Sequence, residues 1–215
     1  MAVTELNKDQ TDSNRTEVTL RRYQRIAWVY DFFSSWLESG LQPGRSQLWE
    51  IVEGPRVLEV GGGTGRNMEF YREGLQITAI DLAPNMLNRA QKQAQRLGKQ
   101  VELLVMDVQG LNFSDASFDS VVATCVFCSV PDPILGLSEV RRVTKPGGRI
   151  LLLEHVRAKD ERIGKVMDFI NPVMVRMMGS NINRRTVENV RKAGLAIERV
   201  INLNKSGIFK LIIIC

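Results

Sequence analysis

The sequence has few of the residues that build metal centres and disulfide scaffolds. It contains three cysteines and a single histidine, His155, among 215 residues. A small, odd number of cysteines is typical of a reducing compartment such as the cytoplasm. One histidine leaves no basis for a His-rich metal site. We therefore expect a cytoplasmic protein that holds no metal.

Long apolar runs are also missing. No apolar stretch approaches the ~20 residues that a transmembrane helix needs, and residues 1–15 lack the apolar segment of a secretory signal. Residues 1–18 show no hydrophobic periodicity, which predicts a flexible leader. With 44% hydrophobic residues, the remaining 19–215 are expected to form a single globular domain.

Positive charge is concentrated at the C-terminal end. The net charge of the chain is +5. Residues 156–215 contain 12 Lys and Arg against 5 Asp and Glu, a net +7, which leaves −2 for residues 1–155. An anionic partner should therefore meet the C-terminal region.

Apolar periodicity predicts that strands alternate with helices. Strands are expected at residues 56–60, 76–80, 101–106, 120–125, 149–154, 196–203 and 209–214. Helices are expected at residues 19–36, 46–52, 66–72, 84–97, 133–142 and 184–193, and a turn at 145–148. This alternation predicts an α/β fold with a doubly wound, mostly parallel sheet. The last two strands lie so close in sequence that they should form an antiparallel hairpin.

A glycine cluster follows the first strand, in the pattern Glu59-x-Gly61-x-Gly63-x-Gly65. Glycines at such a turn permit positive φ and a close approach of the backbone to a ligand. The third glycine of a dinucleotide fingerprint is missing, because that position is Arg66, and no Gly-Lys-[Ser/Thr] marks a P-loop. The carboxylate of Glu59 would also repel a polyphosphate.

Two further acids end the second and third strands. Asp81 can accept hydrogen bonds from both hydroxyls of a ribose. Asp107 can accept one from an adenine amino group, while the Val108 N–H reaches a ring nitrogen. The structural alternative is that these aspartates cap helices. Three acids around a nucleoside favour a ligand that is cationic at its far end.

This ordered set resembles the class I S-adenosylmethionine-dependent methyltransferases, a Rossmann-like fold with seven strands. The segments 81–87, 113–119 and 143–148 agree with that family. The resemblance implies that S-adenosylmethionine is the cofactor. It also implies that Glu59 orients the glycine loop and that Met86 packs on the adenine. The cofactor-binding residues it predicts are Tyr30, Glu59, Gly61, Gly63, Gly65, Asn67, Asp81, Leu82, Met86, Asp107, Val108 and Cys125.

Within the expected N-terminal helices, residues 19–53, the pattern Tyr23-x-x-Ile26-Ala27-x-x-Tyr30-Asp31 resembles the entry helix of methyltransferases that act on lipids, quinones and small thiols. The resemblance implies a lid that excludes water from the cofactor. The alternative is an aromatic stripe that only packs in the core. Tyr23, on the first of these helices, is a candidate to carry a proton away from the substrate.

The pair Cys125 and Cys128 could indicate a redox or zinc site when read alone. Zinc needs two more ligands, and only Cys215 and His155 remain, far away in the sequence. A thioredoxin-type pair would begin a helix, whereas Cys125 ends a strand. Residues 128–133 instead resemble the segment near the transferred methyl in bacterial phosphatidylethanolamine N-methyltransferases and related thiol methyltransferases. The His-His pair common in quinone methyltransferases is absent.

His155 ends the fifth strand on the ligand side of the sheet and could accept a proton from the substrate. A buried structural histidine is the equally weighted alternative. Residues 156–185 form an insertion rich in Met and basic residues, which we interpret as a substrate cap. Its candidate substrate-binding residues are Arg162, Lys165, Met177 and Arg184.

Three hypotheses follow for function. The first is methylation of a phospholipid amine by an enzyme bound peripherally to an anionic membrane surface. The second is methylation of a small apolar thiol or a quinone carbon by the same cofactor site, with the cap as a solvated cover. The third is a non-catalytic adenosylmethionine-binding protein. A nucleic-acid substrate is not expected, because no Asn-Pro-Pro-[Tyr/Phe] motif follows the fourth strand.

Overall fold

The computed structural model describes residues 41–215, and their core is one seven-stranded sheet in the order β3-β2-β1-β4-β5-β7-β6. The strands are β1 (Arg56–Val60), β2 (Gln76–Asp81), β3 (Glu102–Val105), β4 (Phe118–Thr124), β5 (Thr144–His155), β6 (Ile197–Asn202) and β7 (Phe209–Ile214). Neighbours among β1–β5 are parallel, and β7 is antiparallel to both β5 and β6. This confirms the predicted doubly wound sheet with its antiparallel C-terminal strands.

Helices cover both faces of the sheet. They are α2 (Gln42–Glu50), α3 (Pro84–Leu97), α4 (Pro133–Val143), α5 (Glu161–Met178) and α6 (Thr186–Lys192), with a 3₁₀ helix, η1, at Arg66–Phe70. Alternate residues of the central strands serve opposite faces, because side chains on a strand alternate. Leu152 packs with the α4 and α6 side, whereas Leu151 and Leu153 pack with the α2 and α3 side.

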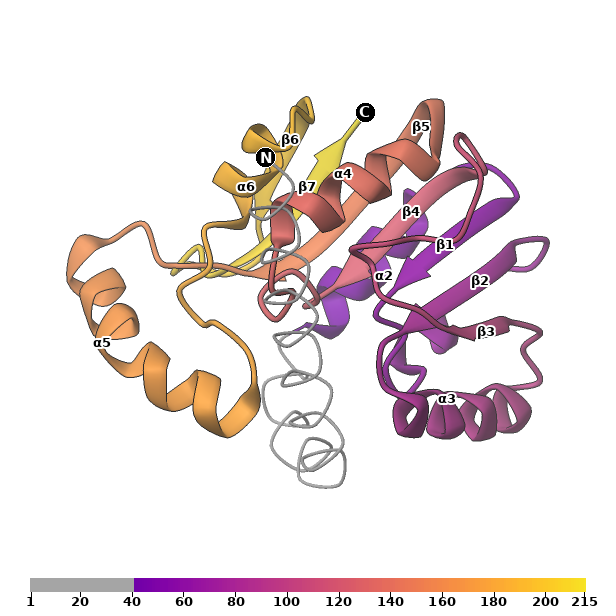
Figure 1. Ribbon diagram of the computed structural model, residues 1–215, viewed down its shortest axis with the longest axis horizontal. Coiled ribbons are helices and arrows are strands. Elements are labelled where there is room, and N and C mark those ends of the chain that lie inside the picture. The colour runs from indigo at the N-terminus through magenta and orange to yellow at the C-terminus, as the bar shows by residue number, and fades with distance from the viewer. Residues whose placement is uncertain (1–40) are drawn as a thin grey trace, which may run out of the picture.

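Helix α5 lies apart from these layers. Figure 1 shows it to one side of the sheet, joined to the body by the segments before and after it. It occupies most of the predicted cap, residues 156–185. None of the helices described between residues 41 and 215 has the length and apolarity needed to cross a bilayer.

Local structure departs from the sequence predictions at several places. Helix α5 forms in a segment where no helix was expected. The helix expected to run to residue 72 is only the short η1, because Tyr71 turns into extended backbone and packs its ring 4.6 Å from that of Trp49. Helix α2 begins four residues before the predicted start at residue 46, with a proline in its first turn, where proline is favoured. The predicted turn at 145–148 is an irregularity within the β4–β5 pairing. The predicted leader and first helix, including Tyr23 and Tyr30, lie outside the described residues.

Candidate functional site

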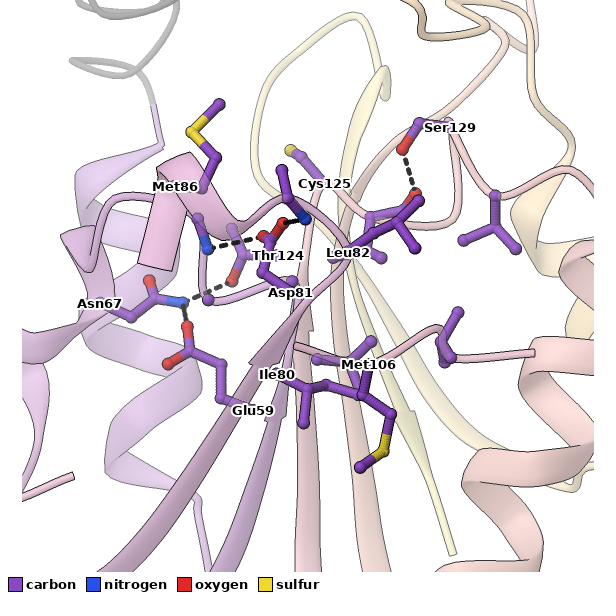
Figure 2. A pocket seen from close by; sticks show the side chains of 18 of the residues that line it. Glu59, Asn67, Ile80, Asp81, Leu82, Met86, Met106, Thr124, Cys125 and Ser129 are labelled. Carbon is purple, nitrogen blue, oxygen red and sulfur yellow. Dashed lines mark hydrogen bonds between the residues drawn. The ribbon is translucent and has the colours of Figure 1, made fainter. Parts of the chain in front are cut away.

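A cavity opens at the carboxyl ends of the parallel strands, where the strand order reverses between β1 and β4. This switch point is the usual ligand site of a doubly wound sheet. Residues from the ends of β1, β2 and β4, the loop after β3, and the helices α2, α3 and η1 line it. Figure 2 shows Glu59 and Asn67 on one side of this cavity, Cys125 and Ser129 on another, and Asp81 between them.

Backbone hydrogen bonds hold the glycine loop in place. Gly61 N and Gly62 N both donate to Ile80 O, at 2.8 and 2.9 Å. Gly63 has a φ of +55°, and a Cβ built on it would have no neighbour closer than 3.9 Å. Because Gly63 lines the cavity, a side chain there would project into ligand space. The loop is therefore a cradle that a side chain at residue 63 would fill.

Asp81 ties that loop to the next strand. Its Oδ2 accepts from Gly63 N and its Oδ1 from Ala83 N, both at 2.9 Å. Burial raises the pKa of Asp81, and the two amide donors oppose the rise. Each carboxylate oxygen retains further acceptor capacity, so this half-buried carboxylate can still accept hydrogen bonds from the hydroxyls of a ribose.

Glu59 lies at the base of the cavity, buried, in a network that fixes the start of η1. Asn67 Nδ2 donates to Glu59 Oε1 at 2.6 Å, and the Tyr71 hydroxyl donates to Oε2. Asn67 Nδ2 also donates to Thr124 Oγ1 at 3.1 Å. Burial raises the pKa of Glu59, whereas the bonds from Tyr71 and Asn67 lower it. Both oxygens of Glu59 are engaged within the protein, a geometry suited to orienting the loop.

Most of the predicted cofactor residues line this one cavity. Glu59, Gly61, Gly63, Asn67, Asp81, Leu82, Met86, Asp107, Val108 and Cys125 all do so. Gly65 does not: its φ is +83°, and an added Cβ would lie 2.9 Å from Met68 Sδ and 3.2 Å from Ala90 Cα. Its small size therefore serves the packing of η1 against α3, rather than contact with a ligand.

His155 lies outside the lining of the cavity. Its ring packs edge to face on Phe209, with centroids 5.2 Å apart, and burial lowers its pKa. Its strand does end on the cavity side of the sheet, as expected. This packing of a neutral imidazole favours the alternative that His155 has a structural role.

The predicted substrate residues do not gather at one place. Arg162, Lys165 and Met177 are exposed along α5. Arg184 instead turns inward: its Nη2 donates to Cys128 O at 3.3 Å and to Val130 O at 2.9 Å. Its guanidinium group is thus engaged with the backbone of the segment after β4.

The two cysteines after β4 are free thiols. Burial, with a contribution from Glu154, raises the pKa of Cys125 to about 12, and burial raises that of Cys128 as well. Thiols of this kind are protonated at neutral pH and poor nucleophiles. Among residues 41–215, no group of three or more His, Cys, Asp or Glu could hold a metal ion.

Arg45 and Glu154 are functional candidates that sequence reasoning missed. Arg45, on α2, is buried, lines the cavity, and donates to Asn67 Oδ1. Its guanidinium places a cation near the three acids, where it can meet a ligand carboxylate. Nothing in its sequence position indicates this, because the packing of α2 brings it there. Glu154 carries a weak signal as an acid that ends an apolar strand, Leu151 to Leu153.

A family model described as a methyltransferase domain matches residues 58–152. The phosphatidylethanolamine N-methyltransferase of Cereibacter sphaeroides is 38% identical over 139 residues, which is 63% of this chain and 66% of that protein. A thiol S-methyltransferase of Rattus norvegicus is 38% identical over 103 residues (46% and 42%). A demethylmenaquinone methyltransferase of Renibacterium salmoninarum is 38% identical over 123 residues (53% and 50%). The chain spans less than two thirds of the length of each relative.

Solved structures show the same fold. A SAM-dependent methyltransferase from Methanosarcina mazei superimposes with a TM-score of 0.59 at 23% identity, covering 74% of this chain and 91% of that one. The [4+2]-cyclase SpnF superimposes with a TM-score of 0.64 at 24% identity, covering 78% and 60%. A cyclase on this fold means that the architecture alone does not establish methyl transfer.

Proposed function

The chain belongs to the class I S-adenosylmethionine-dependent methyltransferases, and we propose that it methylates the amine of a phospholipid headgroup of the phosphatidylethanolamine type. S-adenosylmethionine is the methyl donor of this family. The donor supplies an activated sulfonium methyl, so the protein must align the acceptor, keep it unprotonated and exclude water.

The cavity suits the donor at both of its ends. Asp81 and Asp107 offer acceptors for the ribose and the adenine, and Met86 offers an apolar surface for the base. Glu59 and the glycine loop would hold the methionine half, with Arg45 beside them for its carboxylate. Three acids in one cavity also favour a donor that carries positive charge at its sulfur.

An amine acceptor has to lose its proton before it can attack. An amine with a pKa like that of lysine, ~10, is about 0.1% neutral at pH 7. Apolar surroundings favour the neutral form, and Val126, Val130 and Pro131 line the cavity at the post-β4 side. The proton carrier we propose is His155, Tyr23 or a water. Because the His155 ring lies outside the lining of the cavity, it can take this proton only through a relay.

The observation that carries the lipid assignment is the outer face of α5. Phe169 has 86% of its surface exposed and Met177 65%. These side chains form an apolar stripe at helical spacing, made of Val166, Phe169, Ile170, Val173 and Met177. An exposed stripe of this kind beside cations is typical of helices that lie in a membrane interface.

The charge on α5 favours an anionic lipid surface as the binding partner of this outer face. The helix's two acids, Glu161 and Asp168, both pair with Arg157, each at 3.0 Å. Its three cations, Arg162, Lys165 and Arg176, form no ion pair with any residue in 41–215. The outer face therefore presents positive charge next to the apolar stripe, and the chain would bind the membrane peripherally.

Methyl transfer from labelled S-adenosylmethionine to a panel of acceptors tests this proposal. We expect labelled product from phosphatidylethanolamine vesicles and none from an Asp81→Ala variant. The thiol and quinone relatives match at similar identity, so product only from a small thiol or a quinone would replace the lipid assignment. Donor binding with no product from any acceptor would contradict the enzymatic proposal and favour the non-catalytic alternative.

A further inference from the structure

The segment that follows β4 forms one wall of the donor cavity in an unusual conformation. We call residues 125–131 the post-β4 loop; five of them, Cys125, Val126, Ser129, Val130 and Pro131, line the cavity. Cys125 has a φ of +55°, in the left-handed region that residues other than glycine rarely adopt. Such backbone persists only where the surrounding structure enforces it. Something outside the loop must therefore hold it.

Glu154, at the end of β5, holds the amide side of this loop. Its side chain is fully buried, and its Oε1 accepts from Val126 N at 2.9 Å and from Phe127 N at 3.0 Å. The titratable and charged groups that face it are the thiols of Cys125 and Cys128 and the guanidinium of Arg184. These two hydrogen bonds from backbone amides fix the residues directly after the strained Cys125.

The carbonyl side is held by the segment after α5. Cys128 O accepts from Asn181 N at 2.9 Å, from Asn181 Nδ2 at 3.0 Å and from Arg184 Nη2 at 3.3 Å. The same Arg184 Nη2 reaches Val130 O at 2.9 Å. Two side chains from residues 179–185 thus hold the carbonyls of two residues in the loop.

Asn171 connects this arrangement to α5 itself. Its Oδ1 accepts from Ile182 N at 2.9 Å, and its Nδ2 donates to Asn181 Oδ1 at 3.2 Å. The helix that carries the exposed apolar face is thereby joined by side-chain hydrogen bonds to the residue that holds Cys128 O. The path from α5 to the cavity wall is Asn171, Asn181 and the post-β4 loop.

We propose that Arg184 and Asn181 are positioning residues for the methyl donor, which hold the carbonyl side of the post-β4 loop against Glu154 on its amide side. The proposal rests on the proposed function only in taking the cavity as the donor site. Without this hold, the loop relaxes away from its left-handed start, and the wall beside the donor loses its shape. The cap then serves the donor as well as the acceptor.

The test is Arg184→Ala, with Arg185→Ala as the matched control. Arg185 is the next residue, carries the same charge, is exposed and pairs with Glu188 rather than with the loop. Calorimetry should show affinity for S-adenosylmethionine about tenfold weaker in Arg184→Ala and within about twofold of the parent in Arg185→Ala. Hydrogen exchange of the Val126 and Phe127 amides should speed up in Arg184→Ala only. These amides bond to Glu154, so a purely local role for Arg184 would leave them unchanged.

Two further variants keep the test decisive if Arg184→Ala does not fold. Asn181→Ala removes one of three donors to Cys128 O and should weaken donor affinity about two- to threefold. Arg184→Lys, which can keep one carbonyl contact, should fall between Arg184→Ala and the parent. Unchanged donor affinity and unchanged loop exchange in the folded variants, with only a lower Tm, would overturn the positioning role.

The design separates this proposal from the proposed function. A parent protein that binds no S-adenosylmethionine would contradict the donor site, while the exchange comparison, which needs no ligand, would still decide whether Arg184 holds the loop. A parent that binds the donor but methylates no lipid would contradict only the acceptor assignment. Both readouts use the full chain and involve no acceptor.

Discussion

Gly63 is the residue at which a side chain would compete most directly with the donor for space. A Cβ added at Gly63 would lie in the open cavity, with Gly61 O as its nearest neighbour at 3.9 Å. We therefore expect Gly63→Val to weaken binding of S-adenosylmethionine by at least about tenfold in calorimetry. Strain at φ +55° should also lower the Tm.

Gly74→Val separates the two effects. Gly74 has a φ of +82° and no atom within 4 Å of its built Cβ, and it does not line the cavity. It should lose stability through the same backbone strain while keeping the parent's donor affinity. Equal donor affinity in the Gly63 and Gly74 variants would place the donor elsewhere.

Glu154 predicts a pH dependence of stability with a definite sign. Burial raises its pKa from 4.5 to about 7. Because the folded state binds this proton more tightly than the unfolded state, the contribution to stability is complete below pH 4.5 and is lost as the pH rises through about 7. Glu154→Gln removes the titration and retains an oxygen that can accept from both loop amides.

The measurement is the Tm of parent and Glu154→Gln from pH 5 to pH 8. The Tm of Glu154→Gln minus the Tm of the parent should increase as the pH rises, whatever its value at pH 5. Glu139→Gln is a control of opposite sign, measured below pH 5, because Arg142 lowers the pKa of Glu139 from 4.5. There the Tm of the parent should rise relative to that of the variant as the pH rises towards 4.5, and from pH 5 to pH 8 the difference should be flat. A difference for Glu154 that is flat with pH would contradict its raised pKa.

Among the elements, those with strong local signals could be predicted from sequence. The strand that leads into the glycine loop and the helix that begins at Pro84 are found where expected, because glycine turns and a first-turn proline act through the local backbone. The short η1 could not be predicted. It ends because Tyr71 is drawn into the packing of Trp49 and the hydrogen bond to Glu59, both contacts distant in sequence.

The candidate site divides in the same way. Asp81 ends β2, and Asp107 lies two residues beyond the end of β3. Strand ends in a parallel sheet meet at one edge, so the placement of both aspartates follows from the pattern. Arg184 could not be distinguished from its basic neighbours in the cap, because its inward turn depends on the carbonyls of Cys128 and Val130. Charge in a sequence predicts an electrostatic patch but not which of its members is used internally.

Helix α5 gives a prediction at the scale of an element. Phe169 is so exposed that Phe169→Asp should leave the Tm within about 1 °C or 2 °C of the parent, since surface substitutions change stability little. Sedimentation with anionic vesicles should retain less of the variant, because its most exposed apolar side chain is lost and a negative charge is added.

Leu135→Asp is the matched control on α4. Leu135 is an exposed apolar residue, at 44%, on a helix away from the α5 outer face. It should bind vesicles like the parent. If both variants lose binding equally, the effect is one of added negative charge, and α5 is not the docking element.

At the scale of the whole molecule, the uneven charge predicts how membrane binding responds to salt. Residues 156–215 carry a net charge of +7, and the rest of the chain carries −2. Attraction to an anionic surface acts within a Debye length of ~8 Å at physiological salt, so only basic residues next to the lipid contribute strongly. If local charge decides membrane binding, removing cations from α5 should weaken it more than removing the same number elsewhere in the basic region. If total charge decides it, the two losses should be equal.

The double variant Arg162→Glu and Lys165→Glu distinguishes them when it is compared with Arg191→Glu and Lys192→Glu. Both remove two exposed cations from the basic region and change the net charge equally, but the first pair lies on α5 and the second on α6. At about 1 kcal/mol per basic residue near the surface, the α5 variant should lose most of its binding to anionic vesicles at low salt. The α6 variant should lose much less.

Raising the salt should shrink this difference, because the parent then also binds weakly. Methylation of vesicle-embedded phosphatidylethanolamine should fall with binding in the α5 variant, while methylation of a short-chain, detergent-dispersed substrate should stay near that of the parent. Equal losses in the two double variants would assign binding to total charge. Unchanged binding in both double variants would contradict docking on an anionic surface. It would favour a small apolar acceptor, for which neither pair of charges matters.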